Sequence, residues 1–242
     1  MPTDNTPPKA ALSKERIVDA AYKLAKEDPV NALSMRKVAG VLDVTPMAIY
    51  KYFDDKNQLT AAVIDRHLTE SDLVPDAVDY PEWRHWITES YLRLWDAFDQ
   101  SPGMIHYMTN ATSLGPAVLS WQNEILKVLI NAGLTPKQAL NGHTTMSELA
   151  IGNSIMVPLR NRGLETLFPS IWEDLQAGKV PDLNQLNQSD IPLVDYPWVL
   201  MTGQAMMEEL QNSRKAFYTE LCLVLDSLEN HIVVNNKGSI DY

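Results

Sequence analysis

Two short helical periods separated by a tight turn occupy residues 34–56, and this segment constrains the fold more than any other part of the chain. Ser34 can cap the first helix. The positions of that helix that face inward are Met35, Val38, Ala39 and Leu42. Thr45 can cap the second helix, with Pro46 at its first position, where a missing N–H costs nothing. Because the second helix is barely two turns long, it must pack against helices behind it, and the pair predicts a helix-turn-helix.

Helical periodicity continues on both sides of this segment. An apolar stripe begins after Ser13, which can cap its helix, and a longer helix is expected from about Lys56 to Thr69. Farther along, apolar stripes predict long helices within residues 83–98, 118–130 and 204–232. Residues 135–157 begin with a Thr-Pro helix start and are rich in small residues, which allow close contact between helices. Prolines and mixed polarity predict loops with short helices for residues 158–197. No stretch alternates as a strand does, so the sequence predicts an all-α fold.

The charge of the chain is unevenly distributed. Residues 1–66 hold ten Lys or Arg and nine Asp or Glu, whereas residues 67–242 hold ten against twenty-two, giving +1 and −12 and a total of −11. The acidic part should be repelled by phosphate, so any nucleic-acid contact is expected in the first quarter of the chain. Three prolines and little apolar content predict a disordered arm for residues 1–12.

The sequence gives no sign of a membrane protein, a secreted protein or a metalloprotein. No apolar run approaches the roughly 18 residues that a membrane helix needs, and the N-terminus does not look like a secretion signal. We therefore expect a cytoplasmic protein with no membrane partner. The single Cys222 cannot form an internal disulfide, and no His or Cys cluster has zinc-ligand spacing, so neither a metal nor a cofactor is expected.

The stretch RIVDAAYKLAKEDPVNALSMRKVAGVLDVTPMAIYKYFDDKNQLTAAVID resembles the N-terminal domain of the TetR family of transcriptional regulators. The resemblance implies a helix-turn-helix DNA-binding domain over residues 13–66, followed by a larger helical domain for ligand binding and dimerisation over residues 67–242. Asp43 stands where the family usually has glycine in a left-handed turn. Aspartate tolerates that conformation better than most residues.

The second short helix is expected to lie in the major groove of DNA, with helix N-termini and polar side chains contacting phosphates. Arg36 is long enough to reach a guanine edge, and Pro46, Met47 and Ala48 would approach base edges. The candidate DNA-binding residues are Ser34, Arg36, Thr45, Pro46, Met47, Ala48, Tyr50, Lys51, Tyr52 and Lys56.

The C-terminal half is similar to the tetracycline-repressor branch of the family at GLTPKQALNGHTTMSELAIGNSIM and FYTELCLVLDSLENHI. In that branch the two corresponding helices form a four-helix dimer interface. The implied dimer residues are Phe217, Leu221, Val224, Leu225 and Leu228. The implied or candidate ligand-binding residues are His67, Tyr91, Trp95, His106, Thr109, His143 and Met146. Leu68, Ser90 and Leu94 replace drug-binding residues of that branch, so tetracycline itself is not expected to bind.

The sequence thus predicts a ligand-responsive regulator, and specifically a repressor, that binds a palindromic operator as a homodimer. A small apolar or aromatic inducer would release it from DNA. His67, near the end of the Lys56–Thr69 helix, is expected to modulate induction without touching DNA. Two alternatives are an all-helical enzyme, for which no catalytic spacing stands out, and a protein-binding adaptor whose helix-turn-helix is only structural.

Overall fold

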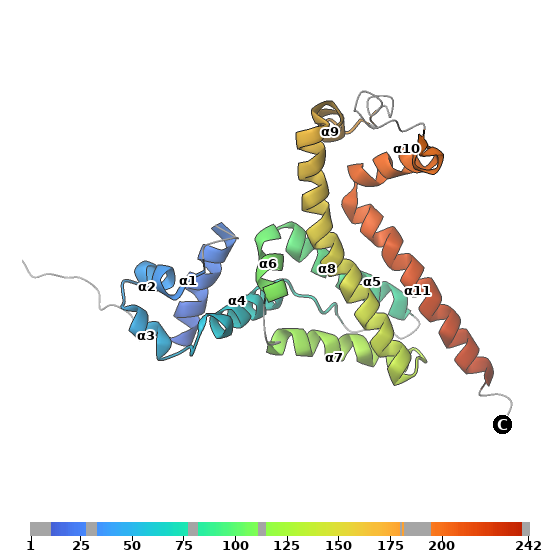
Figure 1. The fold of residues 1–242 in the computed structure, drawn as a ribbon. Coiled ribbons are helices and arrows are strands. Elements are labelled where there is room, and N and C mark those ends of the chain that lie inside the picture. The colour runs from blue at the N-terminus through green and yellow to red at the C-terminus, as the bar shows by residue number, and fades with distance from the viewer. Residues whose placement is uncertain are drawn as a thin grey trace, which may run out of the picture. The chain divides into compact units, whose positions relative to one another are not determined.

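The computed structural model describes residues 11–27, 33–76, 82–110, 115–179, 181 and 195–238, and the regular structure in these ranges is helical (Figure 1). The all-α prediction is confirmed. The predicted arm over residues 1–12 lies mostly outside the described residues. The first helices are α1 (Lys14–Glu27), α2 (Met35–Leu42), α3 (Pro46–Tyr50), α4 (Lys56–Glu70), α5 (Trp83–Asp99) and α6 (Pro102–Asn110). The later ones are α7 (Pro116–Asn131), α8 (Pro136–Leu167), α9 (Pro169–Gln176), α10 (Pro197–Gln211) and α11 (Ser213–Gly238).

The chain divides into two compact units. The first unit combines Met1–Glu70 with Gly103–Leu119, and the second combines Ser71–Pro102 with Ser120–Tyr242. Most of α6 and the first turn of α7 therefore belong with the N-terminal helices. The predicted domain boundary after residue 66 follows sequence order and did not anticipate this returning segment.

In the first unit, α1 packs against α2 and α4, and α2 packs against α3. Small and aliphatic side chains allow these short helices to approach, and they form the core. Its fully buried members include Ile17, Ala21, Val38, Ile49, Leu59 and Val63. Because α3 is too short to be stable alone, the burial of Ile49 in this core holds it in place.

In the second unit, α8 packs against α5, α9 and α11, and Figure 1 shows α8 and α11 side by side. Thr135 and Gln138 form the predicted Thr-Pro start of α8 as a reciprocal capping box. The helices approach closely at Gly142, where an added Cβ would press on the Leu228 side chain. This agrees with the close helix contact expected from the small residues of this stretch.

Two expectations about helix limits are wrong. α8 does not end near Pro158 but continues through it to Leu167, although proline removes one hydrogen bond of the helix. Packing against a small apolar cluster that contains Ile171 and Met207 accompanies this extension, and Leu164 of α8 contacts that cluster. The C-terminal stretch is two helices, because Asn212 interrupts it and accepts a hydrogen bond from the Lys215 N–H as a new N-cap.

None of the described helices combines the length and the apolar character that crossing a membrane requires.

Candidate nucleic-acid interface

The turn between α2 and α3 is built from local hydrogen bonds. The Ser34 hydroxyl accepts from the Lys37 N–H at 3.2 Å, which caps α2. Asp43 ends the helix in the left-handed conformation, with φ 52° and ψ 50°. Its N–H donates to the Gly40 carbonyl at 3.2 Å, and the next N–H, of Val44, donates to the Ala39 carbonyl at 3.0 Å. Asp43 therefore takes the left-handed turn expected at this position.

α3 has one side chain in the core and several pointing away from it. Ile49 is fully buried, whereas the Met47 side chain is 71% exposed and the Tyr50 side chain 47% exposed. Pro46 starts the helix, and the hydroxyl of Thr45 makes no capping bond. A helix of five residues thus presents an outer side that is free to approach another molecule.

The other predicted DNA-binding residues lie on α2, on α3 or beside them. Among these, Arg36, Thr45, Lys51 and Lys56 are exposed, while Ser34, Ala48 and Tyr52 are half-buried. The first unit therefore brings the predicted set to its short helices and to the start of α4. Contact of these residues with DNA stays a prediction.

Tyr52 has a contact that its position in the sequence did not suggest. Its hydroxyl donates to the Leu12 carbonyl at 2.7 Å, and Arg16 donates to the Ala11 carbonyl at 2.9 Å. A phenol has one proton to donate, so Tyr52 cannot donate to a phosphate while this bond is made. Residues 11–12 are instead fixed between α1 and the end of the helix-turn-helix.

The start of α4 is already occupied by a carboxylate. Asp55 accepts from the Gln58 N–H at 2.8 Å, and the Gln58 side chain accepts from the Asp54 N–H at 2.8 Å. This reciprocal arrangement satisfies donors that a phosphate would otherwise use. A phosphate contact at this position would therefore depend on the exposed ammonium group of Lys56.

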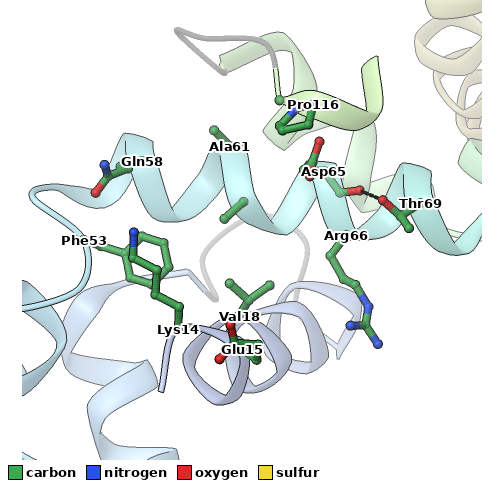
Figure 2. A pocket seen from close by; sticks show the side chains of 12 residues that line it. Lys14, Glu15, Val18, Phe53, Gln58, Ala61, Asp65, Arg66, Thr69 and Pro116 are labelled. Carbon is green, nitrogen blue, oxygen red and sulfur yellow. Dashed lines mark hydrogen bonds between the residues drawn. The ribbon is translucent and has the colours of Figure 1, made fainter. Parts of the chain in front are cut away.

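A further polar contact lies within the first unit between α4 and the start of α7. Asp65 Oδ1 accepts from the Ala117 N–H at 2.6 Å, so a carboxylate caps the N-terminus of α7. Gly115 lies so close that an added Cβ would overlap the Asp65 carboxylate. Figure 2 shows Asp65 beside Pro116, at one end of a hollow of about 440 Å³ that α1 and α4 line together.

His67 is buried in the first unit rather than placed at its surface. Its Nδ1 lies 3.1 Å from the hydroxyl of Tyr22 on α1, and burial raises the pKa of that tyrosine. The same unit holds His106 and Thr109 on α6, both exposed, with the Thr109 hydroxyl donating to the His106 carbonyl. The three residues stay candidates for the ligand response.

The remaining ligand candidates are core residues of the second unit. The Tyr91 hydroxyl lies 2.9 Å from Nδ1 of His143 and 3.3 Å from the Ser147 hydroxyl. The Tyr91 hydroxyl also donates to the His143 carbonyl at 3.1 Å. Burial raises the pKa of Tyr91 and lowers the pKa of His143, because it disfavours the charged form of each. Trp95 and Met146 are also buried, and Trp95 stacks on Phe217.

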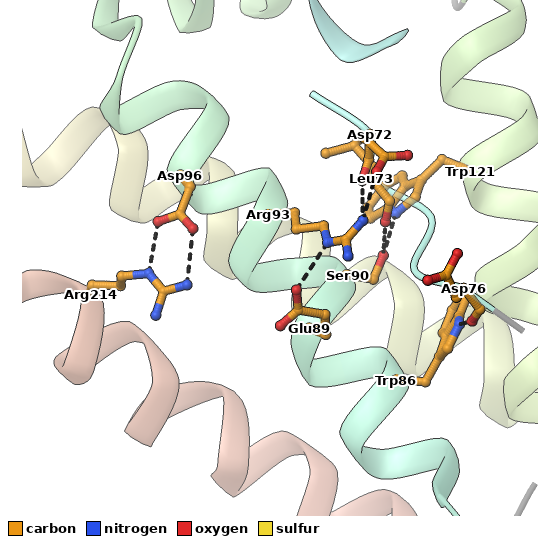
Figure 3. Close-up of polar contacts among 10 residues, drawn as sticks. All are labelled: Asp72, Leu73, Asp76, Trp86, Glu89, Ser90, Arg93, Asp96, Trp121 and Arg214. Carbon is orange, nitrogen blue, oxygen red and sulfur yellow. Dashed lines mark hydrogen bonds and ion pairs between the residues drawn. The ribbon is translucent and has the colours of Figure 1, made fainter. Parts of the chain in front are cut away.

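Figure 3 shows polar contacts that α5 makes with neighbouring segments of the second unit. Ser90 donates to the Leu73 carbonyl at 2.6 Å and accepts from the Trp121 indole at 2.8 Å. Arg214 forms a bidentate ion pair with Asp96. The Trp121 ring in turn lies edge-on to the Tyr91 ring, with the ring centres 5.3 Å apart.

The predicted dimer residues of α11 divide into two groups. Phe217, Leu221 and Leu225 are fully buried within the chain's own second unit. Leu228 is also buried, at 6% exposure, and Val224 is half-buried; both line a groove of about 400 Å³ between α8 and α11. The other residues of this groove are Gln138, Asn141, Gly142, Thr145, Leu223, Ser227 and His231. Among these lining residues, Leu223 is 68% exposed.

A short capped α2, a left-handed turn and an exposed α3 define a helix-turn-helix domain carried by an all-helical protein. Residues 17–63 match the family described as "Bacterial regulatory proteins, tetR family". Over this stretch, which holds the helix-turn-helix, the chain is similar to that family.

Its curated relatives include named repressors. The HTH-type transcriptional repressor DrrR1 of Streptomyces coeruleorubidus is 25% identical over 145 residues, which are 60% of this chain and 53% of that protein. The HTH-type transcriptional repressor Rv1353c of Mycobacterium tuberculosis is 24% identical over 152 residues, which are 61% and 58% of the two chains. The matches thus span little more than half the length of these relatives.

Solved structures share the fold over nearly the whole chain. Apo ActR from Streptomyces coelicolor has a TM-score of 0.72 at 19% identity, covering 92% of this chain and 99% of that one. ActR in complex with actinorhodin gives 0.73 at 20% identity, covering 90% and 96%. TetR from Acinetobacter baumannii AYE gives 0.60 at 20% identity, covering 92% and 99%.

Proposed function

We propose that the chain is a transcriptional repressor that binds a palindromic operator as a homodimer and leaves it when a small molecule binds. The observation that carries this proposal is the outer side of α3, which is exposed and contributes little to the core. It lies within the stretch matched to the TetR family, and the relatives named above are repressors. None of these relatives is named as an enzyme, which favours regulation over catalysis.

DNA contact would fall to the first unit. Residues 67–242 carry a formal charge of −12, which phosphate repels, whereas residues 1–66 carry +1 and hold the exposed cations Arg36, Lys51 and Lys56. Lys51 and Lys56 would contact phosphates and set the position of the protein on the duplex. Arg36 and α3 would read base edges in the major groove.

The homodimer would form through the exposed side of α8 and α11. Two recognition helices must meet half-sites about 34–36 Å apart, which a two-fold axis through a shared helical interface can provide. The exposed Leu223 and the groove beside Val224 and Leu228 offer apolar surface to a partner. The buried Phe217 and Leu225 would support this surface from below rather than touch the second copy.

The inducer would be a small aromatic molecule bound in the second unit. Tyr91, Trp95, His143 and Met146 supply aromatic and apolar surface with a few polar groups, which suits such ligands. Solved neighbours of the same fold were captured with actinorhodin, with (S)-DNPA and with minocycline. Release requires that the inducer bind the DNA-incompetent state about 5–150-fold more tightly, the usual range for such coupling.

The DNA-binding proposal is tested with the full chain and a pool of random-sequence duplexes. Bound duplexes should share an inverted repeat, and binding should weaken steeply with salt. Ala48→Glu should abolish binding, because a carboxylate would face the bases and phosphates. Arg162→Ala, an exposed cation on α8, is the matched control and should bind normally. Normal binding by Ala48→Glu, or a pool without selection, would refute the docking of α3.

The inducer proposal has its own readout. The six tryptophans, at 83, 86, 95, 121, 172 and 198, all belong to the second unit, so a ligand there should change their fluorescence. The same ligand should lower operator affinity. A ligand that releases the operator but leaves tryptophan fluorescence unchanged, and still does so in a Tyr91→Ala variant, would place the inducer elsewhere.

A further inference from the structure

The outer side of α3 is unusually apolar for an exposed surface. In the described part of residues 11–70, the large apolar side chains that are exposed are Val41, Met47 and Tyr50, and two of these three belong to the five-residue α3. A single exposed apolar side chain is ordinary, but Met47 at 71% exposure contributes almost nothing to the core beneath it. The Met47 side chain is therefore free to contact a molecule that binds against α3.

The same side of α3 is poor in groups that form hydrogen bonds. Pro46 and Ala48 have no side-chain donor or acceptor, and the thioether of Met47 is only a weak acceptor. Arg, Lys, Asn and Gln recognise guanine or adenine by paired hydrogen bonds, and Asp or Glu accepts from the amino group of cytosine. Pro46–Tyr50 contains none of these residues. Apolar contact with the C5-methyl group of thymine is the direct readout that remains in the middle of this helix.

We infer that Met47 reads thymine: in each operator half-site its side chain covers the C5-methyl group of a thymine in the major groove. This inference rests on the proposed function, because it requires that α3 enter the groove. The operator would therefore carry an A·T pair at the position opposite Met47. Arg36 would supply the hydrogen-bonded readout of a neighbouring base pair.

The surroundings of Met47 favour DNA over a protein partner. Exposed cations at Arg36, Lys51 and Lys56 lie on α2, beside α3 and at the start of α4. They occur in a chain of net charge −11, in which residues 67–242 are strongly acidic. Residues 34–56 hold four basic residues, which include Lys37, against the exposed carboxylates Asp43, Asp54 and Asp55. Asp55 is already bonded to the Gln58 N–H. Cations beside an apolar helix surface suit a groove that has phosphates along its edges and methyl groups on its floor.

The test uses the full chain and the best duplex recovered from the random pool. Each thymine is replaced in turn, in both half-sites together, by 2′-deoxyuridine, which pairs with adenine in the same way but lacks the methyl group. Losing one buried methyl contact should weaken binding about fourfold, and losing it in both half-sites about 16-fold. The Met47→Ala variant should bind the thymine and uracil duplexes equally at that position.

A matched control separates this readout from a general loss of apolar surface. Met201 on α10 is 66% exposed and lies outside the first unit, so Met201→Ala should keep the full preference for thymine. Salt-dependent, sequence-selective binding with no preference for thymine at any position would overturn the methyl readout and leave the repressor proposal standing. A preference that survives in Met47→Ala would overturn the assignment to Met47.

The absence of any salt-dependent duplex binding would overturn both proposals. If, in that case, a protein bound the chain and lost affinity on Met47→Ala, the apolar side of α3 would be a protein-docking surface instead.

Discussion

The contact between Asp65 and the start of α7 allows a quantitative prediction. Asp65→Ala removes the acceptor of the Ala117 N–H and a negative charge at a helix N-terminus. Loss of such a cap costs about 1–2 kcal/mol of unfolding free energy. Asp65→Asn keeps an acceptor oxygen and loses only the charge, so it should cost about 0.3–1 kcal/mol. The difference between the two variants separates the hydrogen bond from the charge.

Gly115→Ala tests the same contact from the other side. The new Cβ would overlap the Asp65 carboxylate, which must move, and we expect a cost of about 1–3 kcal/mol from overpacking and the lost cap. In the Asp65→Ala background the carboxylate is gone, and the one overlap of the added Cβ that remains is with the Cβ of residue 65, at 2.9 Å. The double variant should therefore be more stable than the sum of the single effects predicts, by about 1 kcal/mol or more.

The assay must report the first unit. All six tryptophans belong to the second unit, so urea unfolding should be followed by far-UV circular dichroism together with tryptophan fluorescence. Amide exchange of the Ala117 N–H gives a local readout and should accelerate in Asp65→Ala. Glu165→Ala, which removes an exposed carboxylate on α8, is the matched control. Additive single effects, or a neutral Gly115→Ala, would refute the argument.

Three other perturbations have defined outcomes. Tyr52→Phe should lower the unfolding free energy by about 1 kcal/mol because it removes the bond to the Leu12 carbonyl, whereas Tyr50→Phe should leave stability unchanged; urea denaturation of both decides this. Burial lowers the pKa of His143 below 6.5, so the unfolded state binds this proton more tightly than the folded state does. The free energy of unfolding should therefore fall as the pH drops below about 6.5, by up to about 1.4 kcal/mol per pH unit. His143→Gln should flatten this dependence in urea denaturation at a series of pH values. Leu223→Glu should yield monomers in sedimentation experiments, and a variant that remained dimeric would contradict the proposed interface.

The helix-turn-helix could be predicted because its determinants are local. The cap at Ser34 and the left-handed turn at Asp43 depend on residues within one turn of the chain, and the structure has both. Apolar spacing correctly placed Ile49 in the core. Short-range hydrogen bonds and burial thus specify this segment without knowledge of distant contacts.

Other features depend on residues far apart in sequence. Tyr52 bonds to the carbonyl of a residue 40 positions away, and Asp65 to an amide 52 positions away. The spacing of apolar residues along a helix gives no information about contacts between residues so far apart in sequence. The continuation of α8 through Pro158 has the same origin, since packing against α9 offsets a local signal that normally ends a helix. The membership of residues 103–119 in the first unit likewise follows from contacts and not from sequence order.

α11 shows how an apolar pattern can have two causes. The apolar spacing of Phe217, Leu221 and Leu225 correctly indicates a buried stripe. The spacing alone does not reveal whether the chain itself or a partner buries these side chains. In the structure they are buried by the chain itself. Leu223 and Val234 lie about three turns apart and so share another side of the helix, where they are 68% and 65% exposed. Packing within the chain thus buries Phe217, Leu221 and Leu225 and leaves Leu223 and Val234 exposed. A second copy of the chain would cover these two side chains, which is why the homodimer proposal depends on Leu223 and not on the stripe that the sequence pattern selects.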